Sequence, residues 1–485
     1  MLILGGGILF VVINAILMSG GFYYFPIVAL IPAVIFLAFF SFTHLFMAVA
    51  FLTPLSIELG RLAGADMSFD ISIPTEPLIV IMVLMVIMKL IHSGTLNTRI
   101  LYHPLSLAIL FYLLWIFITT LTSTMPVVSV KFLIVRIGFI SLFYFFGVEM
   151  FKKPGNRRVF LWCYIAGLTL VALITLVKHS GFAFESHRAA NMLVRPFYND
   201  HTAYGAALAM FIPVLASFTF RGKKRESRWY VWIFLAVFLT AILFSYSRAA
   251  WVSVFAALLV WQVIRLKIKF STLVTFGVIM AGIVIMMWPD IERRLEKNTQ
   301  DSSADVAEHV RSITNISSDA SNLERINRWK AAIAMYREKP LLGWGPGTYM
   351  FQYVPFQTSR DRTIISTNFS DGGDAHSEYL GPLSETGLPG MLSFVLVAVI
   401  ALYTGFRLLV QLKNKKDRVL VAGIVLGLVT YFTHGFLNNF LHSDKSAVPF
   451  WGFAAILVAF DLYGKKLPSA ENKEKPEAAS GNEPV

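Results

Sequence analysis

Charged residues and cysteine are both scarce in this sequence. Only 15% of its 485 residues are charged, whereas 56% are hydrophobic, and its single cysteine, Cys163, lies inside an apolar run. Such a composition is outside the range of soluble globular domains. One cysteine excludes an intramolecular disulfide and a cysteine-based metal site. The composition therefore predicts a polytopic membrane protein.

Motifs for several other chemistries are absent. The sequence has no Gly-x-x-x-x-Gly-Lys-Ser/Thr loop for a nucleotide phosphate and no His-Glu-x-x-His or Cys-x-x-Cys pattern for a metal. We therefore expect no cofactor and no metal site. The net charge of +13 does not indicate nucleic acid, because Lys and Arg cluster in short runs between apolar segments, where they report membrane topology.

Apolar runs of membrane-spanning length dominate the chain. A bilayer core requires about 20 apolar residues per helix, and candidate runs lie at about 2–19, 23–40, 43–57, 74–91, 105–122, 131–150, 158–178, 201–220, 229–246, 249–265, 270–288, 387–410, 418–437 and 448–463. The first run has no basic segment before it, so we expect it to be a retained span. The sequence thus predicts an all-α membrane protein with 12 to 14 transmembrane helices in a lipid bilayer.

The basic loops predict the orientation and the domains. Runs of Lys and Arg at 152–158, 221–225, 265–269, 413–418 and 465–466 indicate the cytoplasmic side, with both termini inside. We expect four parts, which are transmembrane helices with external arginines at 1–288, a large external loop with amphipathic helices at 289–386, further transmembrane helices at 387–464, and a disordered cytoplasmic tail at 465–485.

The large external loop has a recognisable order. Residues 322–336 have helical periodicity, and four large side chains share one face of the predicted helix: Ile326, Trp329, Ile333 and Tyr336. Pro340 ends this helix, and the glycine-rich segment 343–347 predicts a tight turn. Residues 374–390 then close the loop and lead into the next apolar run.

His376 lies where this loop meets the membrane. There it can act as a general base, although a solvated His at a helix start is the ordinary alternative. Four arginines on the same predicted side favour a functional role: Arg195, Arg248, Arg325 and Arg328. Asp371, Asp374 and Glu378 could hold a cation beside His376, but Asp-Gly-Gly-Asp is ordinary turn composition, which favours a solvated acidic loop.

Two of the arginines occupy informative positions. Arg248 lies between two apolar runs with almost no loop, where an ionisable residue usually faces a cavity or a partner. Arg195 precedes a span whose N-terminus Asn199 or Asp200 can cap, so an arginine and a helix N-terminus can form an anion seat. Snorkelling to lipid head groups is the alternative for Arg195. We interpret Arg136 and Lys178 as snorkelling or packing residues.

Three segments together resemble the bacterial O-antigen ligase and O-antigen polymerase superfamily of membrane glycan transferases. They are Ser247-Arg248-Ala249-Ala250-Trp251, then Arg328-Trp329-x-x-Ala332 running to Pro340-Leu341-Leu342-Gly343-Trp344-Gly345-Pro346-Gly347, and Ala375-His376-Ser377-Glu378-Tyr379-Leu380 followed by Glu385-Thr386-Gly387-Leu388-Pro389-Gly390. Asn199-Asp200-His201 is similar too. The resemblance covers about 195–395, and Ser377 departs from it, because many members have Asn there.

The resemblance implies a fold of the helical C-type glycosyltransferase kind, at the inner membrane with the active site facing the periplasm. It implies that His376 and Arg248 are catalytic, and that the donor is a glycan on undecaprenyl diphosphate. Five further residues are expected to bind substrate: Arg195, Arg325, Arg328, His201 and Tyr379. The acceptor is lipid A-core oligosaccharide in a ligase, another lipid-linked glycan in a polymerase, or a protein hydroxyl in other relatives.

Elementary chemistry is compatible with this expectation. A glycosyl diphosphate is already activated, so transfer needs a base for the acceptor hydroxyl and positive charge for the departing diphosphate. A neutral His can supply the first, and arginines can supply the second without a metal. One direct displacement predicts inversion at the anomeric carbon. A transporter or flippase is the alternative from another class, and a structural scaffold is a third hypothesis.

Overall fold

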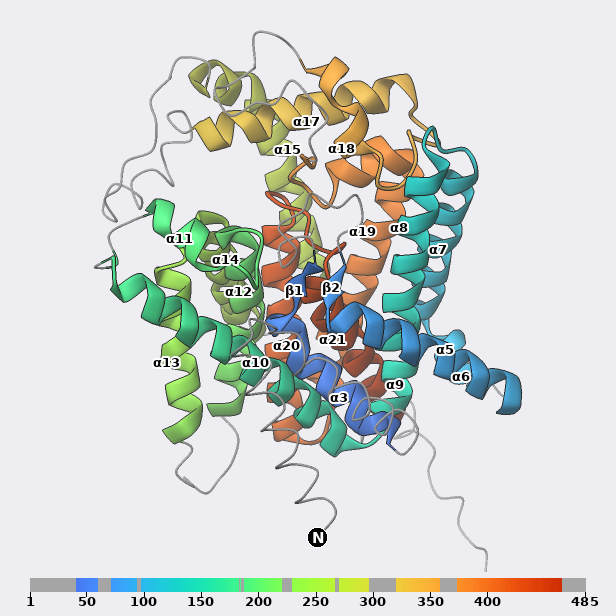
Figure 1. The fold of residues 1–485 in the computed structure, drawn as a ribbon, viewed down its shortest axis with the longest axis vertical. Helices are drawn as coiled ribbons and strands as arrows, with labels where there is room; N and C mark the ends of the chain where they lie inside the picture. The colour runs from blue at the N-terminus through green and yellow to red at the C-terminus, as the bar shows by residue number, and fades with distance from the viewer. Residues whose placement is uncertain are drawn as a thin grey trace, which may run out of the picture.

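The computed structural model describes residues 41–59, 71–93, 97–182, 184, 187–219, 229–266, 270–295, 320–357 and 373–464. The predicted spans at 2–19 and 23–40, the tail at 465–485 and Asp371 lie outside these residues. Within them the molecule is a bundle of α-helices with one two-stranded sheet (Figure 1). The all-α class expected from the apolar runs is confirmed.

Nine helical segments of the described residues are long and apolar enough to cross a membrane. They are α5 (Thr75–Ser93), α7 (Pro104–Leu121), the continuous segment α8, η2 and α9 (Pro126–Phe139, Ile140–Phe146 and Gly147–Met150), α10 (Pro154–Ser180), α12 (His201–Thr219), α14 (Arg248–Arg265), α19 (Leu380–Gln411), α20 (Lys415–His434) and α21 (Asp444–Tyr463). Two shorter apolar segments are α3 with η1 (Phe42–Leu52 and Thr53–Leu55) and α13 (Trp229–Leu243).

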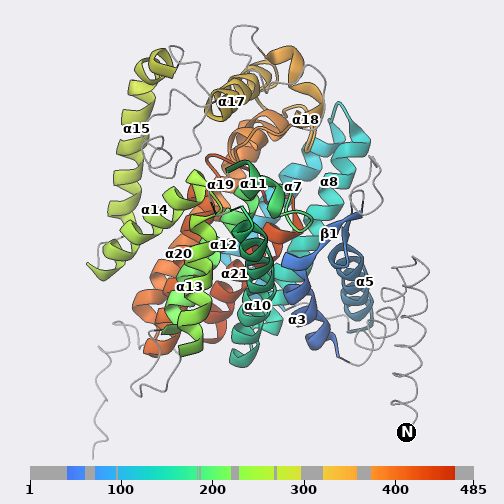
Figure 2. The same cartoon turned by 60° about the vertical axis from the view of Figure 1, so that its left-hand side comes forward.

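The remaining elements are short or lie beside the bundle. They are β1 (Ile57–Glu58), β2 (Ser72–Ile73), α6 (Thr98–Leu101), α11 (His187–Leu193), α15 (Phe270–Leu295), α17 (Ala320–Glu338), α18 (Tyr349–Gln352) and η3 (Val354–Phe356). The strands pair antiparallel, with Ile57 opposite Ile73. Figure 2 shows α15 to one side of the bundle, with Phe276, Val278 and Met286 exposed, as expected of a surface that contacts lipid.

The centre of the bundle is formed by α12, α20 and α21, whose side chains are mostly buried. Several buried polar groups of the bundle are hydrogen-bonded locally, which a bilayer favours. Arg136 of α8 is an example, because it is 6% exposed and its Nη1 donates to the Leu441 carbonyl at 3.1 Å. Of the two roles expected for Arg136, packing is therefore the correct one. Lys178 is exposed and donates to the Arg195 carbonyl at 3.3 Å.

The helices α17 and α18 lie at one end of the bundle, above the start of α19 (Figure 1). A turn at 343–347 connects them to the bundle, with positive φ at its three glycines. Its Trp344 and Gly345 amides donate to the Ser384 and Glu385 carbonyls at 3.1 and 2.8 Å. The N-terminal end of α19 is thereby fixed against the turn between α17 and α18.

Gly387 breaks α19 where this turn packs. Its φ of 70° and ψ of −177° are accessible essentially to glycine alone, and a Cβ there would lie 2.1 Å from the Leu341 carbonyl oxygen. The Leu388 amide donates to the Pro340 carbonyl at 2.9 Å. The predicted start of the span at 387 is thus a break in a longer helix that begins at Leu380.

The buried face of α17 differs from the predicted one. Ile326, Trp329, Ile333 and Tyr336 are only half-buried, whereas the buried face consists of Glu324, Asn327, Arg328, Ala331, Ala332 and Met335. Hydrophobicity alone could not identify this face, because small alanines and an internal ion pair form it. That face packs on Tyr349, Tyr353 and Ala375, so α17 lies directly against the segment that carries His376.

Candidate functional site

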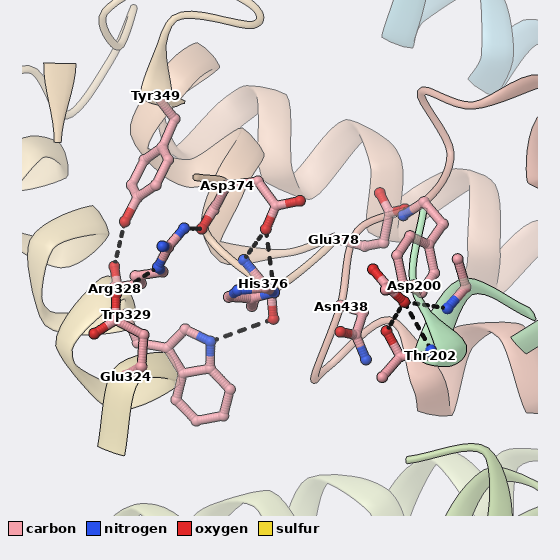
Figure 3. Close-up of polar contacts among 12 residues, drawn as sticks. Asp200, Thr202, Glu324, Arg328, Trp329, Tyr349, Asp374, His376, Glu378 and Asn438 are labelled. Carbon is pink, nitrogen blue, oxygen red and sulfur yellow. Dashed lines mark hydrogen bonds and ion pairs between the residues drawn. The ribbon is translucent and has the colours of Figure 1, made fainter. Parts of the chain in front are cut away.

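The segment around His376 is fixed from α17. Arg328 Nη1 donates to the Asp374 carbonyl at 3.0 Å, and Trp329 Nε1 donates to the His376 carbonyl at 3.4 Å (Figure 3). A Cβ on Gly373 would lie 2.0 Å from Arg328 Nη1, so any other residue there would displace the Arg328 guanidinium group. The position of the imidazole is therefore determined by the helix before it as well as by α19 after it.

A carboxylate orients the His376 ring. Asp374 Oδ1 accepts from the His376 amide at 2.9 Å and lies 3.2 Å from His376 Nδ1. The Asn439 amide, oriented with its nitrogen toward Asp374, donates to both carboxylate oxygens at 2.7 and 3.0 Å. His376 adopts a φ of 47°, in the left-handed region that non-glycine residues occupy rarely, often at functional sites. This chain of contacts assigns the Nδ1 proton toward Asp374 and leaves Nε2 for a reactant.

The surroundings of His376 keep its ring neutral. Partial burial lowers its pKa, the charge of Asp374 opposes this, and the charges of Arg325 and Arg328 lower the pKa further. The net direction is below the ordinary value of about 6.5. The side chain is 34% exposed. A neutral, accessible imidazole can accept a proton at neutral pH.

Arg325 is the residue whose charge reaches the other site groups. Burial lowers its pKa, while the carboxylates of Asp200 and Asp374 raise it. Its charge also acts on Arg248 and on His376. Residues from the segment before α12, from α14, from α17 and from the segment before α19 thus share one electrostatic environment. Two guanidinium groups in such a place favour an anion.

Arg248 is the first residue of α14 and is held by a rigid turn. Ser247 Oγ accepts from the Ala250 amide at 3.4 Å, which caps the helix. Tyr246 adopts a φ of 52° and its hydroxyl donates to the Phe184 carbonyl at 2.6 Å. Trp251 Nε1 donates to the Ile242 carbonyl at 2.8 Å. The Ser-Arg-Ala-Ala-Trp motif therefore fixes the origin of the Arg248 side chain.

Arg328 is engaged by its own helix and its neighbours. Its Nε donates to Glu324 Oε1 at 2.8 Å, and its guanidinium lies 5.2 Å from the centre of the Tyr353 ring. Burial lowers its pKa, but the Glu324 carboxylate together with Tyr353 and Tyr349 outweighs burial, so the pKa is raised. These contacts favour a positioning role for Arg328, which holds the His376 segment in place.

Three other predicted substrate ligands have different surroundings. Arg195 is exposed in the turn before α12, and within the described chain it makes no ion pair with the His376 cluster. His201 Nδ1 lies 3.2 Å from Asn191 Oδ1, and its charge acts on Asp200. The Tyr379 hydroxyl donates to the Phe432 carbonyl of α20 at 3.0 Å. Of these three residues, His201 is the one whose charge acts on Asp200, and the charge of Asp200 in turn acts on Arg325.

The anion-binding site expected at the start of α12 is occupied by a carboxylate of the protein itself. Asp200 Oδ1 accepts from the Thr202 amide at 2.7 Å, from the Thr202 hydroxyl at 2.5 Å and from the Ala203 amide at 2.8 Å (Figure 3). Burial raises the Asp200 pKa, but these bonds and the charge of His201 outweigh burial and lower it. Asp200 is thus the helix cap that the sequence allowed, and its carboxylate replaces an external anion there.

The acidic loop is not uniformly solvated as expected. Glu378 is 6% exposed, and its Oε1 accepts from the Tyr431 hydroxyl at 2.5 Å and from the Phe440 and Leu441 amides at 2.7 Å each. It anchors the loop between α20 and α21. Among the described residues no group of three His, Cys, Asp or Glu side chains is placed to hold a metal.

Ser377, the departure from the expected motif, has a capping role. Its Oγ accepts from the Tyr379 and Leu380 amides at 3.3 Å each. Asparagine caps helix starts equally well. The difference between Ser and Asn at this position therefore leaves the start of α19 intact.

Several site residues were not identified from the sequence. Asn438, Asn439 and His434 lie at the end of α20 and in the loop after it, and Asp200 was assigned only as a cap. They come together because α20 packs against α12, α14 and α19. The only sequence signal was the polar Asn-Asn pair in the short external segment at 438–447.

One comparison with known proteins bears on this geometry. Residues 232–395 match a family model described as O-antigen ligase, and no curated protein matches the chain significantly. The matched residues run from α13 into α19, and they include Arg248, Arg325, Arg328 and His376. This match covers about a third of the chain, and over these residues the protein is similar to the O-antigen ligase family, which supports a relationship to the superfamily of O-antigen ligases and O-antigen polymerases.

Proposed function

We propose that this protein transfers a glycan from undecaprenyl diphosphate to an acceptor hydroxyl, with lipid A-core oligosaccharide as the acceptor, at the periplasmic face of the bacterial inner membrane. The observation that carries the proposal is the neutral His376, oriented by Asp374 and under the charge of Arg325, which also acts on Arg248. A base for the acceptor and cations for a diphosphate are the two groups that this reaction needs.

The reaction is a single displacement. His376 Nε2 takes the proton of the acceptor hydroxyl as that oxygen attacks the anomeric carbon of the donor sugar. The bond between this carbon and the diphosphate oxygen breaks, and the negative charge that develops on the diphosphate is stabilised by Arg248 and Arg325. The anomeric configuration is inverted because the acceptor enters opposite the departing group. Asp374 stabilises the protonated imidazole.

The reaction as proposed uses no metal. Arg248 and Arg325 supply the charge that a divalent cation supplies in many soluble transferases. Of the acidic residues near His376, Glu378 accepts hydrogen bonds from α20 and from the loop before α21, and Asp374 accepts from Asn439 and His376. These contacts support a role for Asp374 in orienting the base.

The description of the matched family favours a ligase, and the polymerase and the protein O-oligosaccharyltransferase are the alternatives within the superfamily. Deleting the gene and separating the surface glycans by electrophoresis distinguishes them. A ligase predicts bare lipid A-core with glycan stranded on the carrier lipid. One capping repeat unit would instead indicate a polymerase, and unglycosylated protein a protein transferase.

The same deletion strain tests the two hypotheses in which the protein is not an enzyme, the structural scaffold and the flippase. Complementation with His376→Ala should fail if the protein is a transferase. A structural scaffold predicts full rescue by this variant. A flippase predicts that the lipid-linked glycan accumulates on the cytoplasmic leaflet, which an impermeant glycan-modifying reagent can detect.

A further inference from the structure

A second histidine lies at the site and has no part in the reaction above. His434 ends α20 and is 2% exposed. Its Nδ1 lies 3.4 Å from Asn438 Nδ2, which is a donor, and its ring lies 5.6 Å from the ring of Phe440. Since Nδ1 accepts this bond, we assign the proton of the neutral ring to Nε2.

This Nε2 group is buried and has no hydrogen-bond partner within the described residues. Buried polar groups in proteins are nearly always hydrogen-bonded. The charges of Arg325 and Asp200 both act on the ring, so His434 belongs to the same cluster as His376. In the view of Figure 3, its partner Asn438 is drawn between His376 and Asp200.

Asp200, whose charge acts on the His434 ring, offers a hydrogen-bond acceptor. Its three hydrogen bonds from Thr202 and Ala203 all go to Oδ1, which leaves Oδ2 for another donor. A carboxylate repels a phosphate, whereas sugar hydroxyls both donate and accept hydrogen bonds. A neutral N–H donor and a carboxylate oxygen therefore fit hydroxyl groups better than they fit a diphosphate.

We propose that His434 and Asp200 form a subsite for the sugar that is attached to the diphosphate, with the His434 Nε2–H group donating to a sugar hydroxyl and Asp200 Oδ2 accepting from one. The site is then divided between a cationic half, Arg248 and Arg325, for the diphosphate and a neutral to acidic half for the glycan. This inference rests on the proposed function, and it adds a residue that determines donor specificity.

The test measures the binding of two probes to the purified full-length protein in lipid nanodiscs. One probe is undecaprenyl diphosphate without sugar, and the other is the lipid-linked glycan extracted from the host cell. The variant His434→Phe keeps a ring and removes the donor, and it should weaken binding of the glycan-linked probe about tenfold, the loss expected for one buried hydrogen bond. Its affinity for the bare diphosphate should equal that of the wild type.

Further variants separate a sugar contact from a structural role. His434→Gln carries an amide donor and should recover much of the lost affinity. Asp200→Asn retains a capping side chain and should show the same selective loss as His434→Phe. His442→Phe is the matched control, because His442 is exposed in the same loop, and it should bind both probes normally.

Unchanged binding in His434→Phe would overturn the inference, as would an equal loss for both probes, which would indicate a diphosphate contact or a packing defect. Failure of His434→Gln to recover affinity would show that the His434 Nε2–H group does not bond the sugar and that the ring has only a structural role. A wild-type protein that binds neither probe would contradict the proposed function instead.

Discussion

At the residue scale, the state of one imidazole controls the proposed chemistry. His376 must be neutral to act as a base, and its pKa is lowered chiefly by burial and by the charges of Arg325 and Arg328, against the opposing charge of Asp374. Activity should therefore rise with pH through a value below about 6.5 and be constant above it. A profile of kcat/KM against pH measures this value.

Asp374→Asn should move the acidic limb of that profile to lower pH. The Asp374 charge raises the His376 pKa, so its removal lowers the pKa further and makes the base weaker, which also reduces the plateau rate. Glu338→Gln, with the same charge change at an exposed position of α17, should leave the limb in place. An acidic limb above pH 7, or one that Asp374→Asn does not move, would contradict the role of His376.

At this scale, the sequence identified candidate residues only where residue type and local context were unusual. A histidine at a membrane boundary and Arg248 between two apolar runs could be recognised from a single sequence. Asp200, His434 and Asn439 could not, because each is ordinary in its own segment. Their proximity to the site depends on how α12 and α20 pack, which no local pattern specifies.

At the element scale, the break in α19 at Gly387 determines how the segment after α17 packs on the bundle. Gly387→Ala would place a Cβ 2.1 Å from the Leu341 carbonyl oxygen at a φ of 70°, and it should destabilise the fold by about 2 kcal/mol or more. Thermal unfolding in detergent, followed by tryptophan fluorescence, should show a lower Tm, and activity should fall with it. Gly138→Ala is the control, because no atom lies within 4 Å of its Cβ position; equal Tm values for the two variants would refute this account.

Helix positions were predictable because span length is set by the bilayer. Predicted runs such as 105–122 and 448–463 correspond to α7 at Pro104–Leu121 and α21 at Asp444–Tyr463. The orientation of α17 was not predictable. Its buried face carries Glu324 and Arg328, whose mutual ion pair makes burial tolerable, and a hydrophobic pattern cannot reveal such a pair.

At the scale of the whole molecule, the bundle collects charges from distant parts of the chain onto one site. In the proposed mechanism arginines supply the positive charge that a metal would otherwise supply, so activity should survive complete removal of divalent cations. The measurement is the transfer rate after dialysis against EDTA, compared with a sample to which excess magnesium is returned. Loss of activity with EDTA and recovery with magnesium would instead make Asp374 a metal ligand.

The most direct test of the central claim is glycan transfer by the purified protein in lipid nanodiscs, where no ion gradient exists. Supplied with lipid-linked glycan and lipid A-core, the wild type should form a new glycolipid detectable by mass spectrometry. His376→Ala and Arg248→Ala should each reduce the rate at least about a hundredfold at unchanged Tm. A wild type that consumes no lipid-linked glycan, or both variants at full rate, would contradict the account.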